Sequence, residues 1–240
     1  MTNGLYTSAA AMLPAMLQQD VIANNLANLQ TTGFKKDDLF LRTLVEAGLL
    51  VDRAQNETVV EMYTDFDQGP LKPTGNPLDL ALSGEGFFTV QTPEGIRYTR
   101  NGSFTLNPQG QLTTLEGYLV LGQNGTIDLA RGEISITETG EVLQDGKLVD
   151  KLLITDFPKP YPLKKIGNGL FVPLNEAERG SRAEAPVVKQ GFLEQANVNA
   201  LEEMVNMLTH ARIYELNQKA VKYQDETLTR TVNELGKVSL

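Results

Sequence analysis

Residues 1–30 read MTNGLYTSAAAMLPAMLQQDVIANNLANLQ. Apolar side chains recur in this stretch at alternating steps of three and four residues, a heptad spacing that only Gln19 breaks. These side chains are Leu5, Ala9, Met12, Met16, Ala23 and Leu26. The spacing predicts a helix that buries one side against a partner helix.

Charge is nearly absent from this predicted helix, because Asp20 is the only charged side chain before Lys35. A surface helix of a soluble monomer normally carries charged groups on its outer face. Small, uncharged side chains on that face favour close packing against neighbours on several sides. An ordinary core helix is the alternative interpretation of the same pattern.

Residues 198–236 again show a helical pattern. At its start, Asn199 and Glu202 form a pair that resembles a capping box. The apolar residues of this segment form three short seams in place of one stripe. The seams are Leu201, Met204 and Leu208; Ile213, Leu216, Ala220 and Tyr223; and Leu228, Val232 and Leu235. A long helix with several seams can contact more than one partner.

The middle of the sequence predicts β-structure. Short apolar runs are separated by turn sequences such as Asp145-Gly146 and Asn168-Gly169. The runs include Leu78–Leu82, Phe87–Val90, Tyr118–Leu121, Ile134–Ile136, Leu152–Ile154 and Leu170–Val172. Regular turns with no helical period between them indicate an antiparallel sandwich or barrel.

We therefore predict an α+β fold, with the amino- and carboxy-terminal helices paired as a coiled-coil-like unit and a central antiparallel β domain. The predicted helical assembly domain comprises residues 1–30 and 198–240. Linking segments occupy residues 31–77 and 191–197, and the β domain occupies residues 78–190. Two paired helices have little core of their own, so the helical domain should gain stability by association.

Composition excludes several classes of function. The chain has 240 residues, a formal net charge of -9 and no cysteine. The negative charge argues against nucleic acid as a partner, since phosphate binding needs a basic surface. The absence of cysteine excludes disulfide scaffolds, thiolate catalysis and cysteine-based zinc sites. The longest apolar run near the start, Ala9–Leu17, is too short to span a bilayer and contains Pro14, so we expect no direct membrane insertion.

Catalytic interpretations find little support, and we expect neither a cofactor nor a metal nor an enzymatic activity. His210 is the only histidine, and no Gly-x-Ser-x-Gly sequence occurs to supply a nucleophile elbow. A structural histidine on the second helix is therefore favoured. The pair Gly84-x-Gly86 lacks the third glycine of a dinucleotide-binding loop and reads as a turn into a strand.

Three segments of the chain are more specific than short motifs. The first is ANNLANLQTTGFK at residues 23–35, and the second is GEGFF at residues 84–88 with YTRNGSF at residues 98–104. The third is QGFLEQANVN at residues 190–199, followed by EEMVNM at 202–207 and YELNQKA at 214–220. These segments resemble those of a known family, the rod and hook proteins of the bacterial flagellum. They occur in the order that the family has and cover both ends and the middle of the chain.

The resemblance implies a function for each part of the chain. In that family, paired terminal helices form the inner wall of a hollow axial tube, linking segments form a second layer, and the β domain faces outward. It implies a rod subunit in the periplasm-spanning basal body, exported by the flagellar type III system, whose partners are copies of itself, other rod and hook proteins, and the export apparatus. The length and the absence of an obvious long insertion favour the proximal-rod type, with the distal rod as the second choice. A secreted β-domain binding module with helical tethers is the alternative function.

The first resembling segment also has a physical interpretation. Asn24, Asn25 and Asn28 are spaced to share a helix face, and their amides can bond across a subunit contact. Capping and turn formation by Asn28 is the alternative. Gly33 predicts a positive-φ helix stop and Phe34 an anchor, whereas Lys35 and the three charged residues after it predict a solvated turn. The predicted assembly interface is Leu5, Ala9, Met12, Met16, Ala23, Asn24, Asn25, Leu26, Asn28, Leu201, Met204, Leu208, Ile213, Leu216, Ala220, Tyr223, Leu228, Val232 and Leu235.

Overall fold

The structure, a computed structural model, describes residues 2–43, 58–130, 132–175 and 180–238, with the side chains of 2–10, 41–43, 58–60 and 232–238 left undescribed. It forms two compact units. The helical unit comprises residues 1–27, 37–65 and 199–240, and the β unit comprises residues 28–36 and 66–198. The expected linking segment 31–77 is thus divided between the two units.

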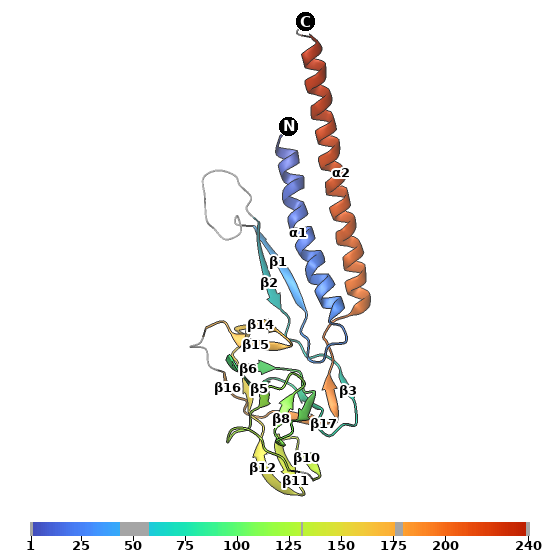
Figure 1. Ribbon diagram of the computed structural model, residues 1–240. Coiled ribbons are helices and arrows are strands. Elements are labelled where there is room, and N and C mark those ends of the chain that lie inside the picture. Colours follow the sequence, from blue (N-terminus) through green and yellow to red (C-terminus); the bar gives the residue numbers. More distant parts are fainter. Residues whose placement is uncertain (1, 44–57, 131, 176–179, 239–240) are drawn as a thin grey trace. The chain divides into compact units, whose positions relative to one another are not determined.

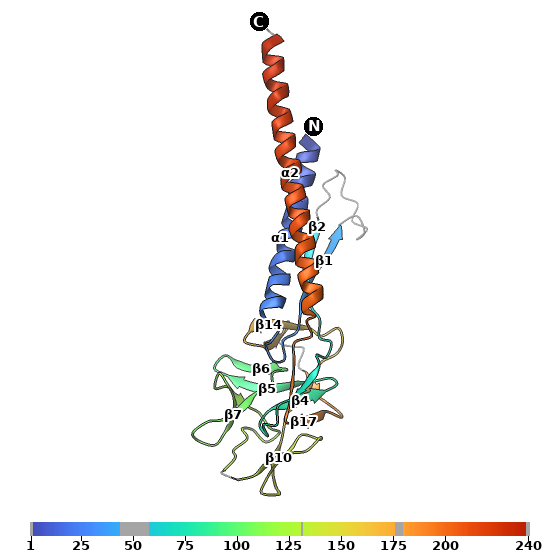
Figure 2. The ribbon, with the colours of Figure 1, turned by 90° about the vertical axis from the view of Figure 1, so that its right-hand side faces the viewer.

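The helical unit contains α1 (Thr2–Ala27), β1 (Asp37–Thr43), β2 (Thr58–Thr64) and α2 (Ala200–Val238). Figures 1 and 2 show α1 and α2 side by side and antiparallel, and α2 extends past the start of α1. Pro14 lies inside α1, and the helix continues through it. The predicted pairing of the terminal helices is confirmed.

A hairpin of β1 and β2 packs beside α1 (Figure 1). The two strands are antiparallel, and Leu39 of β1 lies directly opposite Met62 of β2. No sequence pattern predicted this hairpin, because residues 44–57 separate its strands and no two-residue turn motif marks it. The helical unit therefore contains a β-hairpin in addition to the two helices that the sequence predicted.

The β unit is built from short antiparallel strands, as predicted. Its strands are β3 (Leu71–Pro73), β4 (Leu80–Ser83), β5 (Phe87–Thr92), β6 (Gly95–Thr99), β7 (Phe104–Leu106), β8 (Leu112–Thr114), β9 (Leu119–Val120), β10 (Ile134–Ile136), β11 (Glu141–Gln144), β12 (Lys147–Lys151), β13 (Ile154–Asp156), β14 (Leu163–Gly167), β15 (Leu170–Pro173), β16 (Ser181–Arg182), β17 (Val187–Gln190) and β18 (Phe192–Glu194). In the described part of the chain, the largest sheet has the order β14-β15-β6-β5-β9-β8-β7, with β13 joined to β5 and β16 to β13. Smaller sheets are β10-β11-β12, β17-β4 and β18-β3.

Two predicted turns connect neighbouring strands of these sheets. Asp145-Gly146 joins β11 to β12, and Asn168-Gly169 joins β14 to β15. All four residues have positive φ, between 49° and 76°. Two consecutive residues of positive φ match the right-handed twist of a hairpin, which is why Asn-Gly and Asp-Gly mark such turns in sequences.

Strand β5 lies at the centre of the core and is buried on both faces. Phe88 and Val90 point into a large aliphatic cluster that includes Leu80, whereas Phe87 points into an aromatic cluster with Phe171. Successive side chains of a strand point to opposite faces, so the run FFTV fills two separate cores. The aromatic cluster also contains Phe157 and Leu163, with Phe66, Tyr98 and Tyr161 packed against it.

Candidate functional site

A buried ionic cluster lies within the β unit, centred on Glu194 at the end of β18. Glu194 is fully buried, and its Oε1 accepts a hydrogen bond from Lys35 Nζ at 2.6 Å and one from the backbone N–H of Gly69 at 3.0 Å. Its Oε2 accepts from Arg100 Nη1 at 3.3 Å. Lys35 Nζ also donates to the carbonyl of Asp67 at 2.8 Å. We call Lys35, Arg100 and Glu194 the Glu194 network.

Arg100 has further contacts within the β unit. Its Nη2 donates to the carbonyl of Gly84 at 2.7 Å, and its guanidinium lies 5.1 Å from the ring centroid of Phe87. The side chain is only 4% exposed. A planar guanidinium suits this position, because it can donate in several directions while its face rests on an aromatic ring.

The loop that follows α1 is tied to the same cluster. The N–H of Gly33 donates to the carbonyl of Glu194 at 2.7 Å, and the N–H of Lys36 donates to Asn197 Oδ1 at 2.7 Å. Gly33 has a φ of 67°, and a Cβ atom there would lie 2.4 Å from the backbone of Arg100. A glycine is therefore required both by conformation and by close approach.

The structure confirms part of the prediction for this loop and corrects another part. Gly33 has the predicted positive φ, and Phe34 is buried as an anchor. The prediction of a solvated turn is wrong for Lys35, which is 1% exposed, and for Asp37 and Asp38, which begin strand β1. The loss of hydration is offset because the ammonium group has a carboxylate and a backbone carbonyl as partners.

The helical unit is held together by one side of α2. Buried and partly buried positions recur on α2 at steps of three and four residues, the spacing of a helix that packs on one partner. We call these positions the inner seam: Glu203, Met207, His210, Tyr214, Asn217, Val221, Gln224 and Leu228. Among residues 11–27 of α1, whose side chains the structure describes, the most buried are Ala15, Ile22 and Asn25. His210 thus belongs to a packed helix face.

Large apolar side chains also occupy the opposite side of α2. At 100° per residue, these positions centre about half a turn away from the inner seam. Two cationic residues, Arg212 and Lys219, lie among these apolar positions. We call the whole set the outer seam: Leu201, Val205, Leu208, Arg212, Leu216, Lys219 and Tyr223. Leu201 is 73% exposed, Leu208 61% and Leu216 65%. An isolated subunit therefore presents an apolar stripe to water, which is typical of an interaction site.

The predicted interface residues are distributed between these two sides of α2 and α1. Exposed ones are Met16, Ala23, Asn24, Leu201, Met204, Leu208, Ile213, Leu216 and Tyr223, whereas Met12, Leu26, Asn28, Ala220 and Leu228 are partly buried. The side chains of Leu5, Ala9, Val232 and Leu235 lie outside the described residues. Val205 was missed by the sequence interpretation, although it lies on the same side as Leu201 and Leu208.

The three asparagines at the end of α1 do not share one environment. Asn25 is 2% exposed; its Nδ2 donates to the carbonyl of Asp37 at 2.8 Å, and its Oδ1 accepts from the N–H of Asp37 at 3.0 Å. Its amide thus holds the hairpin to α1 within one subunit. Asn28 follows the helix in a turn, where its carbonyl accepts from the N–H of Thr31 at 3.0 Å. Asn24 is exposed beside a groove.

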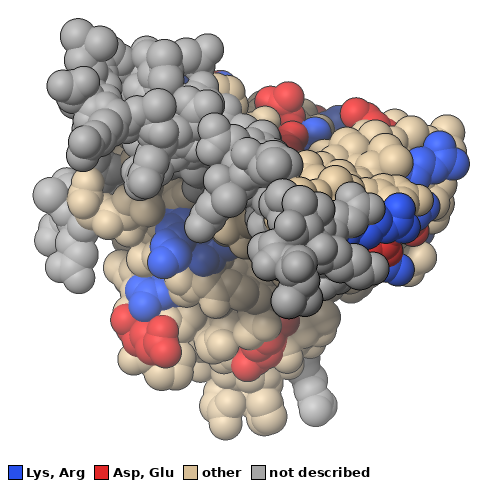
Figure 3. Space-filling view, turned by 90° about the horizontal axis from the view of Figure 1, so that it is seen from above, with Lys and Arg blue, Asp and Glu red and all other residues tan. Residues whose placement is uncertain are grey.

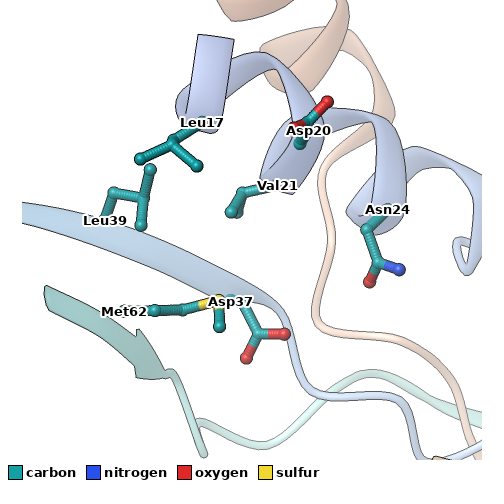
Figure 4. A pocket seen from close by; sticks show the side chains of 7 residues that line it. All are labelled: Leu17, Asp20, Val21, Asn24, Asp37, Leu39 and Met62. Carbon is teal, nitrogen blue, oxygen red and sulfur yellow. The ribbon is translucent and has the colours of Figure 1, made fainter. Parts of the chain in front are cut away.

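That groove lies between α1 and the hairpin, with a volume of about 490 Å³. Leu17, Val21 and Asn24 line it from α1, where they recur one turn apart; Asp20 lies at its edge (Figure 4). Asp37, Leu39 and Met62 line it from the hairpin. The groove is therefore mostly apolar, with two carboxylates at its rim.

On the face seen in Figure 3, basic and acidic groups are scattered over a surface that is mostly neither. Among the described residues, no group of three or more His, Asp or Glu side chains could hold a metal ion. No described helix is both long enough and apolar enough to cross a membrane.

Comparison with known proteins connects these features. Residues 5–35 match the family "Flagella basal body rod protein", residues 81–144 match "Flagellar hook protein FlgE/F/G D1 domain", and residues 189–235 match "Flagellar basal body rod FlgEFG protein C-terminal". Each match contributes one member of the Glu194 network: Lys35, Arg100 and Glu194, respectively. The three matched segments therefore meet in one buried cluster.

Full-length relatives give the same result. The flagellar basal-body rod protein FlgF of Caulobacter vibrioides is 33% identical, covering 100% of both chains. FlgG of Buchnera aphidicola subsp. Acyrthosiphon pisum is 34% identical, over 96% of this chain and 98% of the relative. FlgG of Bacillus subtilis is 31% identical, over 97% and 99%. The chain belongs to the flagellar basal-body rod protein family, whose members are structural, non-enzymatic subunits of the rod.

Proposed function

We propose that this subunit enters the basal-body rod through its helical unit and that the outer seam of α2 is a contact with neighbouring subunits. The observation that carries the proposal is the exposure of the outer seam. Leu201, Leu208 and Leu216 are each more than 60% exposed, although α2 already has a second side packed within the subunit. Burial of these leucines against other helices would contribute about 1.5–3 kcal/mol per side chain. The copies that surround the subunit in a rod would supply those helices.

A single substitution tests this role. Leu208→Asp places an unpaired carboxylate in the proposed contact, and burial of an unpaired charge costs several kcal/mol. We expect a folded, exported protein that no longer enters the rod, and non-motile cells. Immunoblots of isolated basal bodies and of the exported fraction measure incorporation and export separately.

Leu115→Asp is the matched control, because Leu115 is a leucine of similar exposure, 68%, in the β unit. It should leave incorporation unchanged. Normal incorporation of Leu208→Asp would show that the outer seam is not an assembly contact. Equal loss with both variants would show that the effect is not specific to α2.

The position of the subunit within the rod is a second part of the proposal. We place it in the proximal rod, with the distal rod as the other choice. The alignment with FlgF of Caulobacter vibrioides leaves no part of either chain uncovered, and residues 35–76 contain no obvious long insertion. Cryo-electron microscopy of basal bodies that carry a labelled subunit would test this position. Density for the label near the hook would contradict it.

We further propose that the subunit leaves the cytoplasm through the flagellar type III apparatus and assembles with copies of itself and with other rod and hook proteins. Membership of the rod family supports this route and these partners. Cells that lack the export apparatus should retain the subunit in the cytoplasm. Its appearance outside such cells would contradict the route. The family assignment favours this rod function over a secreted β-domain binding module with helical tethers.

A further inference from the structure

The groove between α1 and the hairpin has a shape and a charge that suit a helix. Leu17, Val21 and Asn24 follow one side of α1 over about 10 Å. Leu39 and Met62, which are directly paired across the hairpin, form the opposite wall. Met62 is 66% exposed, so the wall presents an apolar side chain to water. Figure 4 shows these side chains along a common opening between the helix and the strands.

The carboxylates of the groove select the charge of its occupant. Asp20 is exposed at the edge of the groove and is the only charged side chain among residues 1–34. Asp37 lies on the hairpin side, where its Oδ1 accepts a hydrogen bond from Thr64. An apolar segment with a cation near its middle fits this arrangement better than a purely apolar one.

The outer seam of α2 contains such a segment. Leu208, Arg212 and Leu216 lie at steps of four residues, which places the guanidinium between two exposed leucines over about 12 Å. This length matches the apolar side of α1 in the groove. Glu215 lies at the edge of the seam and leaves Arg212 as the central charge. The subunit's own α2 packs through the inner seam, on the opposite side of the helix, so a second molecule must supply this segment.

We propose that the groove receives the Leu208–Leu216 section of the outer seam of α2 from a second copy of this chain. Arg212 lies beside Asp20, and the two leucines cover Leu17, Val21 and Met62. This inference rests on the proposed rod function and adds the partner surface to it. Because the donor seam and the acceptor groove are different surfaces of one chain, the contact is heterologous. Heterologous contacts that do not close into a ring produce open helical assemblies.

Disulfide cross-linking tests the contact in assembled rods. The chain has no cysteine, so a disulfide between two of its copies reports only introduced cysteines. Cells that lack the untagged subunit would express a tagged Met62→Cys chain together with a differently tagged Leu208→Cys or Leu216→Cys chain. On oxidation of isolated basal bodies, at least one combination should give a dimer that carries both tags. Leu115→Cys replaces the second partner in the control and should give none.

A charge exchange tests the same contact without cysteine. Asp20→Arg and Arg212→Asp should each lower incorporation into basal bodies about tenfold, the effect of losing one close interfacial charge pair. The double variant should restore incorporation to within about threefold of the original protein. Arg230→Asp is the control for the partner site: Arg230 lies five turns along the same side of α2, and its change should not rescue Asp20→Arg.

The outcomes separate this inference from the proposed function. If both cysteine chains are recovered in rods without a mixed dimer, or if Leu115→Cys cross-links equally well, the groove does not receive α2 and the rod function stands. Cross-links from Met62→Cys to a different rod protein alone would also contradict the inference. If a tagged chain without any substitution is absent from basal bodies, that result contradicts the rod function itself, and the groove contact with it.

Discussion

Lys35 and Glu194 are 159 positions apart in the sequence, and the ammonium nitrogen of one lies 2.6 Å from a carboxylate oxygen of the other in the interior of the β unit. Both side chains are at most 1% exposed. The pair joins the loop after α1 to the strand that precedes α2. Removal of the pair should therefore destabilise both the loop after α1 and the strand before α2.

Glu194→Ala should destabilise the β unit by about 3–5 kcal/mol, because it leaves two buried cations, Lys35 and Arg100, without their carboxylate. Urea unfolding monitored by circular dichroism measures the change. Glu94→Ala is the matched control: the carboxylate of Glu94 is 80% exposed and 3.5 Å from Arg97, so its loss should cost less than about 1 kcal/mol. Equal stability of the two variants would contradict a structural role for the Glu194 network.

Gly33→Ala should cost about 3 kcal/mol, since it adds a clash with the backbone of Arg100 to the strain of a positive φ. Gly75→Ala separates the two effects. Gly75 has a φ of 75° with open space around the added Cβ, so only the conformational cost of about 1–2 kcal/mol applies. Thermal unfolding of both variants checks the order. A Gly33→Ala protein as stable as Gly75→Ala would show that the loop can shift away from Arg100.

Asn25→Ala should loosen the hairpin from α1 at a cost of about 1–3 kcal/mol, because the backbone of Asp37 loses both a donor and an acceptor. Hydrogen exchange at the amides of β1 and β2 should become faster. Gln218→Ala is the control, because it removes a side-chain amide from an exposed position of α2 in the same unit. It should leave exchange in the hairpin unchanged, and a similar effect of both variants would argue against the anchoring role of Asn25.

Tyr161 makes stability fall at alkaline pH. Burial in the aromatic cluster raises its pKa, with Asp156 and Glu85 adding to the effect. The unfolded chain therefore loses this proton at a lower pH than the folded chain, so the stabilisation is complete below pH about 10 and is lost as pH rises through the folded pKa. The pKa of Lys159 is also raised, chiefly by its hydrogen bond to Glu85, which acts in the same direction.

Tyr161→Phe removes the ionisable hydroxyl and keeps the ring that packs on Phe66 and Phe87. The original protein should lose more stability than this variant when the pH is raised above about 10. Denaturant midpoints measured across that range give the comparison. Parallel curves for the two proteins would show that the Tyr161 proton does not contribute.

Local patterns were sufficient to predict the terminal helices, several short apolar strands such as β5, and the turns at Asp145-Gly146 and Asn168-Gly169. Each of these depends on side chains close in sequence, where spacing and turn chemistry act directly. The pairing of the two ends was predicted because the middle of the sequence offers neither of them another helix as a partner. The sequence pattern placed Leu201 and Leu208 in one predicted seam and Leu216 in another. Their common side of α2 could be assigned only once the structure showed the inner seam.

Long-range polar pairing was beyond the reach of the sequence pattern. Lys35 stands next to Lys36 and two aspartates, a composition typical of a solvated turn, and nothing near it indicates a carboxylate that far along the chain. Arg100 and Glu194 gave no signal either, because a buried charge looks the same in sequence as an exposed one. The β1–β2 hairpin was missed for a related reason, since its pairing joins segments that no short turn connects.

The pairing of α1 with α2 also fixes when the subunit can become complete. A chain that is made, or threaded through a channel, from one end to the other delivers Thr2–Ala27 first and Ala200–Val238 last. Contacts between such distant segments form late, because the loop between them must close before they contribute. Until then α1 has no helical partner within its own chain, and the chain lacks the outer seam of α2. The order of the elements along the chain thus delays the complete pair of helices until Ala200–Val238 has been delivered.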